Sequence, residues 1–155
     1  MKRLSKLAGL PVVLQATGKR VARVERACLS DDGQQLSGVV VQLFGFGRRR
    51  RFVEFGNILL FGQVSLQVLS LCRVPPAHRE AAGNRRVYDT SGELLGWMTD
   101  GLLDENDGRI RALELSYGYL DDLSLGRVWV RDFASQACGF IAARPPEPAG
   151  NANQS

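Results

Sequence analysis

The sequence contains one loose internal repeat. A glycine-led turn followed by a short apolar run occupies residues 18–24 and recurs at residues 92–98. In each half an acidic glycine turn comes next, at residues 30–33 and again at residues 104–108, and a second apolar run follows it. The two copies lie about 74 residues apart, which is long for a solenoid unit and suits a small domain duplicated once.

Alternating side chains indicate β-strands in both copies. In the first copy they lie at residues 23–28, 39–43, 51–55, 58–62 and 64–69, and in the second at 112–115, 128–133 and 138–142. Such period-2 patterns are typical of a barrel wall. Residues 132–137 are expected to form one helical turn at most. We therefore predict an all-β fold of two small tandem barrels, packed together because domains of about 65–75 residues bury too little surface alone.

Proline- and glycine-rich segments set the expected boundaries. The first barrel is assigned to residues 1–74 and the second, more divergent barrel to residues 84–144. Two prolines and an Ala/Gly-rich run make residues 75–83 a linker in which no strand is expected. Residues 145–155 are small and polar after a proline-rich stretch, which predicts a disordered tail.

Composition argues against several classes of protein. No apolar run approaches the roughly 20 residues of a membrane helix, and the start of the chain lacks a signal-peptide cleavage pattern, so a cytoplasmic location is expected. Cys28, Cys72 and Cys138 are far apart and are expected to be reduced structural thiols. The single histidine, His78, lies in the linker without a nucleophile motif. We expect no enzyme, no metal and no cofactor.

Charge is divided unevenly between the halves. Residues 1–79 hold 13 Lys/Arg and 4 Asp/Glu, a net charge of +9, whereas residues 80–155 hold 7 Arg and 12 Asp/Glu, a net charge of −5. This division predicts either an anionic partner for the first half or docking between the opposite halves.

The strongest candidate site is an arginine run. Arg48-Arg49-Arg50-Arg51 follows Phe44-Gly45-Phe46-Gly47, which places four guanidinium groups near a hairpin tip. Guanidinium groups bind phosphates in a bidentate manner, and Phe44 or Phe46 could offer a face for base stacking. Arg20, Arg23 and Arg26 extend this candidate surface. The alternative is a solvated turn with both phenylalanines in the core.

Two tryptophans are candidates for apolar contacts. Trp97 and Trp129 both fall on expected strands of the second copy. They would serve either in core and inter-barrel packing, including an apolar seam between the halves, or as an exposed anchor for a partner protein.

The first half resembles the opening and closing segments of PRC-barrel domains. The opening is carried by residues 5–13, Ser-Lys-Leu-Ala-Gly-Leu-Pro-Val-Val, with Thr17-Gly18-Lys19 and Val24, and the closing segment by residues 53–62. The resemblance covers about residues 4–70. In residues 84–143 it rests mostly on the internal repeat, because the Gly-Leu-Pro-Val opening is missing and residues 133–137 replace the usual closing pattern.

This resemblance implies a small β-barrel of six strands that serves as a module rather than a catalyst. The family includes the cytoplasmic domain of the photosynthetic reaction centre H subunit and the C-terminal domain of a small-subunit ribosome maturation factor. It implies a non-enzymatic adaptor or scaffold that binds a protein partner. The alternative is an RNA-binding or ribosome-assembly module that acts through Arg48–Arg51. Self-association into a homo-oligomer stays open.

Overall fold

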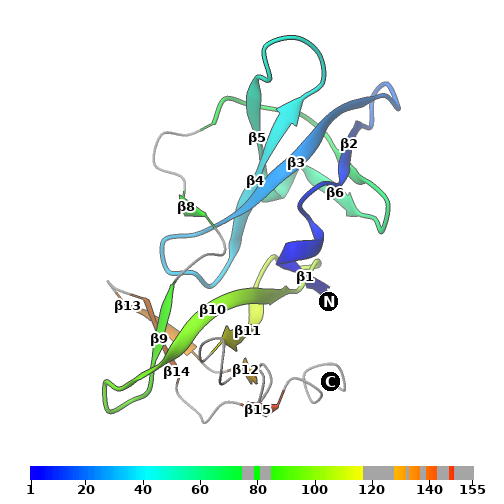
Figure 1. Cartoon of the computed structure of the whole chain (residues 1–155). Coiled ribbons are helices and arrows are strands. Elements are labelled where there is room, and N and C mark those ends of the chain that lie inside the picture. Colours follow the sequence, from blue (N-terminus) through cyan, green and yellow to red (C-terminus); the bar gives the residue numbers. More distant parts are fainter. Residues whose placement is uncertain are drawn as a thin grey trace.

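A computed structural model describes residues 1–74, 79–80, 85–116, 128–131, 133–136, 139–142 and 147–148. In these residues the regular structure consists of β-strands and two short 3-10 helices, Leu4–Lys6 (η1) and Phe55–Asn57 (η2). The predicted all-β fold of two PRC-type units packed together is confirmed (Figure 1).

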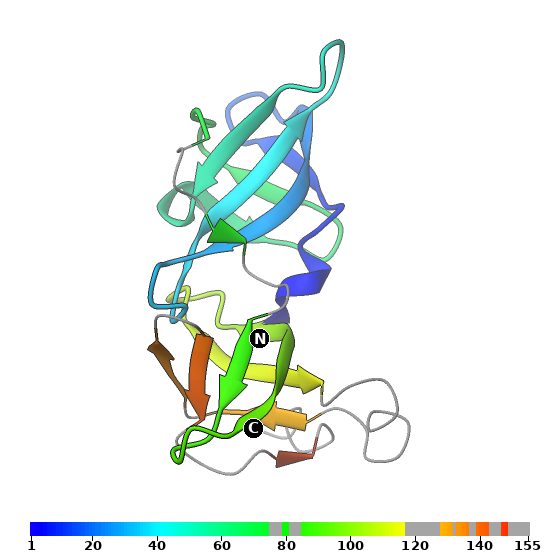
Figure 2. The same ribbon diagram turned by 60° about the vertical axis from the view of Figure 1, so that its left-hand side comes forward.

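The two halves form separate sheets with the same strand order. The first sheet runs β5-β4-β3-β2-β7-β6 and the second runs β12-β11-β10-β9-β14-β13 (Figure 2). The first comprises β2 (Pro11–Leu14), β3 (Arg20–Leu29), β4 (Leu36–Leu43), β5 (Arg50–Glu54), β6 (Ile58–Phe61) and β7 (Leu66–Val68). The second comprises β9 (Arg86–Tyr88), β10 (Leu94–Leu103), β11 (Ile110–Ser116), β12 (Val128–Val130), β13 (Phe133–Gln136) and β14 (Gly139–Ala142).

The repeat read from the sequence extends to strand register. Leu29 pairs with Leu36 across β3 and β4, and 74 residues later Leu103 pairs with Ile110 across β10 and β11. Both hairpins carry register shifts at two equivalent places, Val24/Arg26 and Cys28/Leu29 in the first half and Met98/Asp100 and Leu102/Leu103 in the second. Because a bulge adds local twist and bends a strand, both long hairpins curl alike.

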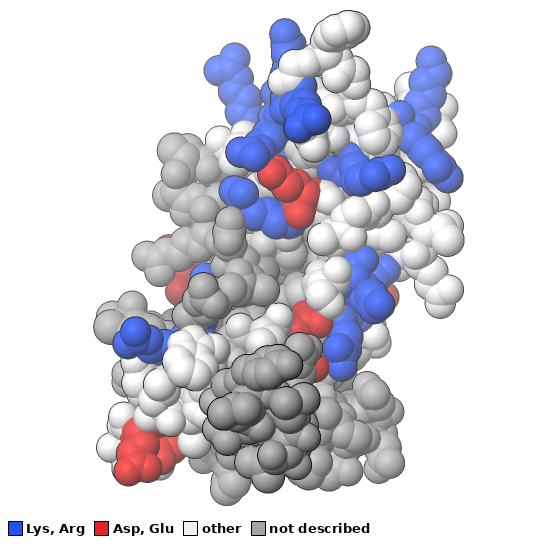
Figure 3. Space-filling view, viewed as in Figure 1, with Lys and Arg blue, Asp and Glu red and all other residues white. Residues whose placement is uncertain are grey.

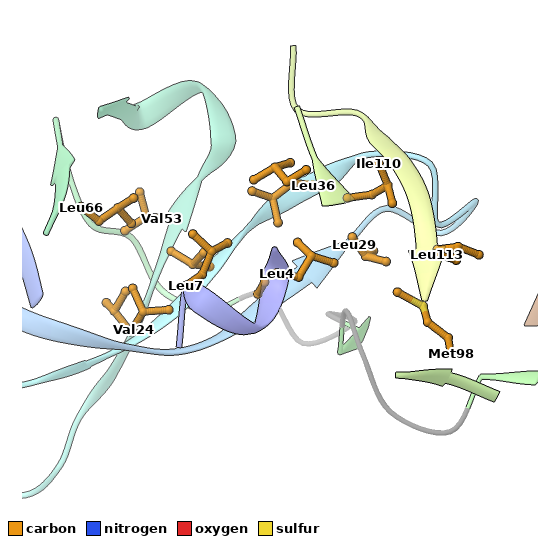
Figure 4. Packing of buried hydrophobic residues seen from close by; sticks show 14 of the residues in the cluster. Leu4, Leu7, Val24, Leu29, Leu36, Val53, Leu66, Met98, Ile110 and Leu113 are labelled. Atoms are coloured by element: carbon orange, nitrogen blue, oxygen red, sulfur yellow. The ribbon is translucent and has the colours of Figure 1, made fainter. Parts of the chain in front are cut away.

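One apolar core runs through both halves. Buried side chains from the two sheets belong to a single cluster, shown in part in Figure 4: Leu4, Leu7, Val24, Leu29, Leu36, Val53 and Leu66 from the first half, and Met98, Leu103, Ile110 and Leu113 from the second. The contact is also close at Gly108, where a Cβ would lie 3.0 Å from the Phe55 ring. Gly108 also has φ +76°, so two constraints favour glycine there.

The shared cluster at the seam contains aliphatic side chains and Met98, with the ring of Phe55 packed against it, and neither tryptophan belongs to it. The expectation that Trp97 and Trp129 would form the seam is therefore wrong. Successive side chains on a strand point to opposite faces. On β10 and β12 the neighbouring residues Met98 and Val130 face the shared core. Trp129 therefore packs in a separate small cluster, with Leu102 and Ala112.

Two short strands cross between the halves. Lys2–Arg3 (β1) begins the first half yet pairs with β10 of the second sheet. Arg79–Glu80 (β8) lies in the expected linker and pairs with β3 of the first sheet. The expectation of a linker without a strand is thus wrong at Arg79–Glu80.

Two further segments differ from the sequence-based expectation. Residues 133–136 form strand β13, which pairs with β14, rather than a helical turn. Glu147–Pro148 (β15), within the expected tail, pairs with β12. The rest of residues 145–155, together with most of the linker, lies outside the described residues.

Candidate functional site

The arginine run lies on the hairpin between β4 and β5, at the end of the first half farthest from the second. The backbone N–H of Leu43 donates to the carbonyl of Arg49 at 2.8 Å and closes the loop. Gly45 and Gly47 have φ of +108° and +87°, and Arg48 itself has φ +43°. Glycine adopts such angles without strain, so the Gly-Phe-Gly spacing shapes this tip.

The two phenylalanines of the tip do not enter the core. Phe46 is fully exposed and Phe44 is half exposed. The alternative in which both phenylalanines pack in the core is therefore wrong. Phe46 instead presents an open aromatic face beside the arginines.

Three of these arginines line a pocket of about 580 Å³ on the outer face of the first sheet. Its walls are Arg26, Arg49, Arg50, Arg51, Arg73 and Val74. Arg26 comes from β3, while Arg50 and Arg51 come from β5, two strands away in the sheet. Arg26 thus belongs to the surface as expected, whereas Arg73 was not anticipated from the sequence.

Arg73 reaches the pocket because the chain after β7 returns along β5. The backbone of Cys72 forms two hydrogen bonds with Phe52, one in each direction, at 2.7 and 2.8 Å. The thiol of Cys72 also donates to the Phe52 carbonyl at 3.2 Å. Desolvation by burial, and then the negative charge of Glu54, raise the pKa of Cys72, so it stays a neutral thiol near pH 7.

The charges on this surface are only partly neutralised. Arg50 forms an ion pair with Glu25 at 2.8 Å, and Arg51 donates to the carbonyl of Arg50 at 2.9 Å. Within the described part of the chain, no ion pair involves Arg48, Arg49 or Arg73. Figure 3 shows Lys and Arg side chains gathered over this end of the molecule.

The pocket and its rim form a concave cationic surface, which we call the arginine surface: Arg26, Arg48, Arg49, Arg50, Arg51 and Arg73. Guanidinium groups stay protonated and act as donors only, so this surface can bind carboxylates or phosphates but offers no general base. Arg20 and Arg23 are exposed on β3, and Arg23 pairs with Gln42, which in turn pairs with Arg50. Arg23 therefore extends the surface across the sheet.

The two tryptophans occupy different environments. Trp129 is 1% exposed and packs in the second half, whereas Trp97 on β10 is 38% exposed. Trp129 is therefore a packing residue, and only Trp97 is placed where a partner could contact it.

A second polar site was not anticipated from the sequence. In the second half, Asp100 and Glu114 are 4% and 2% exposed, and both are approached by the guanidinium of Arg3. Arg3 lies 97 residues or more from both carboxylates along the chain, and no local pattern links them. A comparison of the repeats would have shown only that Asp100 and Glu114 occupy the positions of Arg26 and Val40.

Some sequence-based expectations concern other chemistry. Among the described residues, no three His, Cys, Asp or Glu side chains are arranged to hold a metal ion, and no helix has the length and apolarity needed to cross a membrane. His78 and Cys138 lie outside the described residues.

Comparison with known proteins fits the geometry. A search of curated proteins gave no match. The model of the PRC-barrel domain family matches residues 1–66 and again residues 83–128, once in each half. These two matches cover most of the first sheet, and strands β9, β10 and β11 of the second. The chain therefore belongs to the PRC-barrel domain family.

Proposed function

We propose that this protein is a non-enzymatic adaptor that binds an acidic segment of a protein partner on the arginine surface. PRC-barrel domains are known for roles in protein–protein interaction and are generally non-catalytic. The observation that carries the proposal is the pocket lined by five arginines from two strands, the β4–β5 loop and the returning chain. We place this activity in the cytoplasm, as the sequence indicates.

The geometry of the arginine surface suits carboxylates held in an extended segment. Planar guanidinium groups pair with carboxylates through two parallel hydrogen bonds, which fixes orientation as well as charge. Exposed pairs contribute roughly 0–1 kcal/mol each, so several arginines must act together. The exposed ring of Phe46 adds an aromatic contact at the rim, and aromatic residues are common anchors in interfaces.

The test compares two variants with the same change in net charge. Arg48→Ser/Arg49→Ser removes two cations from the arginine surface, and Arg86→Ser/Arg109→Ser removes two exposed cations from the second half. Each protein is used as bait in nuclease-treated lysate of the source cells. We expect a partner retained by the parent and by the second-half variant but lost with the first. Equal retention by both variants would remove the arginine surface from the interaction.

RNA binding through Arg48–Arg51 is the second candidate, and the exposed ring of Phe46 among the arginines favours it. Aromatic faces stack on bases while arginines contact phosphates. If RNA is the partner, nuclease treatment of the lysate abolishes its retention by the parent protein. Replacing all four arginines with serine should then lower the salt slope of log affinity by roughly 3–4 units. An unchanged slope would reject this candidate.

A further inference from the structure

The two halves meet across an approximate twofold axis. The backbone N–H of Leu36 donates to Gly108, and the backbone N–H of Ile110 donates to Gln34, at 2.7 and 2.8 Å. Residues 34 and 36 are the repeat equivalents of residues 108 and 110. Between them Gln35 pairs with its own equivalent, Arg109. Such reciprocal contacts are typical of an isologous interface between identical subunits.

The same symmetry relates the two crossing strands. Lys2 and Arg3 of β1 pair with Leu103 and Leu102 of β10. Arg79 and Glu80 of β8 pair with Leu29 and Cys28 of β3, which are the equivalent positions. Each half therefore gives the short strand that precedes it to the sheet of the other half. We call β1 and β8 the lead strands.

Main-chain pairing alone cannot select the correct lead strand. Backbone hydrogen bonds to a sheet edge form with any extended segment, and side chains supply the specificity. The side chains that surround each lead strand must therefore distinguish β1 from β8.

In the second half the selecting groups are two buried carboxylates and an aromatic ring. The guanidinium of Arg3 lies 3.2 Å from Glu114, 3.9 Å from Asp100 and 5.2 Å from the centre of the Trp129 ring. Ser5 donates to Asp100 from its backbone N–H at 3.0 Å and from its hydroxyl at 2.6 Å. This site recognises an Arg-x-Ser segment, with the arginine at the end of β1 and the serine in η1, by charge, cation–π contact and hydrogen bonding.

At the equivalent positions of the first half the charges are reversed. Arg26 occupies the position of Asp100 in the long hairpin strand, and Glu80 occupies the position of Arg3 in the lead strand. Val40 takes the place of Glu114. The residues at these equivalent register positions therefore differ in charge although the backbones are related by the same symmetry.

We propose that the reversed charges make each half pair with the other half and not with a second copy of itself. The second half accepts a lead strand with arginine at its second position, as in β1, and the first half accepts one with glutamate there, as in β8. In a like pair of second halves, Glu80 would meet Asp100 and Glu114 in a buried site. In a like pair of first halves, Arg3 would meet Arg26. Like charges that lose water on burial are costly, and such repulsion of wrong partners is a common source of specificity. The two halves of one chain therefore pair with each other, and neither half pairs with the identical half of another chain.

The test uses the full chain and three substitutions near the lead strand. Arg3→Met removes the charge at similar length, Arg3→Glu gives β1 the charge of β8, and Lys6→Glu makes an equal change at an exposed neighbour. Urea unfolding midpoints are compared with the parent protein. We expect Lys6→Glu to stay near the parent midpoint. Arg3→Glu should fall below Arg3→Met by roughly 1 M, because it adds a third carboxylate to a buried pair.

The same three residues are then compared in an Asp100→Asn/Glu114→Gln background. If charge selects the lead strand, glutamate and methionine at position 3 give the same midpoint there. If the difference persists, or if Arg3→Glu and Arg3→Met match in the parent background, the proposal is overturned.

A reciprocal comparison keeps the proposal testable if Arg3→Glu does not fold. Glu80→Lys gives β8 the charge of β1, and Glu80→Gln only removes its charge. We expect Glu80→Lys to lower the urea unfolding midpoint more than Glu80→Gln does. In an Arg26→Met background the two Glu80 variants should have the same midpoint. Equal unfolding midpoints for the two Glu80 variants would overturn the claim that charge also selects the lead strand of the first half.

Discussion

The seam between the halves can be tested at Leu4, which η1 carries from the first half into the shared core. Leu4 is 4% exposed, and its Cδ1 lies 2.9 Å from the position that a Cβ on Gly101 would take. Leu4→Ala deletes three carbons at this contact. Their transfer from water accounts for about 2.4 kcal/mol, and the cavity left behind brings the expected loss of unfolding free energy to roughly 3–5 kcal/mol.

The void can be partly refilled from the other half. Gly101→Ala alone is expected to cost roughly 1–3 kcal/mol, because the new methyl group collides with Leu4. Its Cβ would also lie 3.4 Å from Met98 and Ile110, which are ordinary contacts. In the Leu4→Ala background the new methyl group at position 101 enters the void. The double variant should therefore lose less unfolding free energy than the sum of the two single losses, by at least about 1 kcal/mol.

Urea unfolding of the four proteins gives this coupling energy. Leu60→Ala serves as the control, because the same deletion at a half-exposed position on β6 should change stability by about 0.5 kcal/mol or less. Additivity of Leu4→Ala and Gly101→Ala within about 0.5 kcal/mol would refute the contact between the halves. So would a loss at Leu4 no larger than that at Leu60.

Three further outcomes are expected. Trp129→Ala should cost about 3–5 kcal/mol of unfolding free energy in urea, while Trp97→Ala should cost far less; equal losses would contradict their different burial. The hydroxyl of Ser91 and then backbone N–H groups lower the pKa of Asp89. The ionised side chain of Asp89 therefore contributes fully to stability above the pKa of the unfolded chain, near 3.8, and this contribution is lost as the pH falls through the lower pKa of the folded protein. Asp89→Asn should make the urea unfolding midpoint depend less on pH between pH 5 and about pH 3. Midpoints that fall with pH as steeply in the variant as in the parent would reject this. Alkylation of Cys72, followed by peptide mass spectrometry, should be slow at pH 7 and rise more steeply above pH 9 than for a model thiol, because its pKa is raised; a pH profile like that of the model thiol would contradict the raised pKa.

Much of the architecture could be predicted from the sequence, because strands and turns depend on local patterns. Alternating side chains located β3, β4 and β5, and the acidic glycine turns located the hairpins that join the long strands. The offset of the repeat predicted the equivalence of the two halves, which extends to matching register shifts. The arginine hairpin was likewise predicted, since Arg48–Arg51 are adjacent in the chain.

Other features were decided only by the tertiary structure. Alternation puts Trp129 on one face of β12, but the sequence does not say which face meets the shared core. Arg73 joins the arginine surface because Cys72 pairs with Phe52 on the edge of β5. The side of a sheet that is buried, and the edge that is covered, depend on segments far away in the chain.

The lead strands show this limit most clearly. Lys2 and Arg3 are too few to show any periodicity, and nothing near them in the sequence indicates a partner more than 90 residues away. Their place follows from the free edge that the second sheet presents once it has formed and from the buried carboxylates of Asp100 and Glu114 beside that edge. The sequence alone determined two similar β units of unequal charge. The tertiary structure decided how they exchange strands, because edge pairing and the neutralisation of buried charge are set by surfaces that exist only after each sheet has folded.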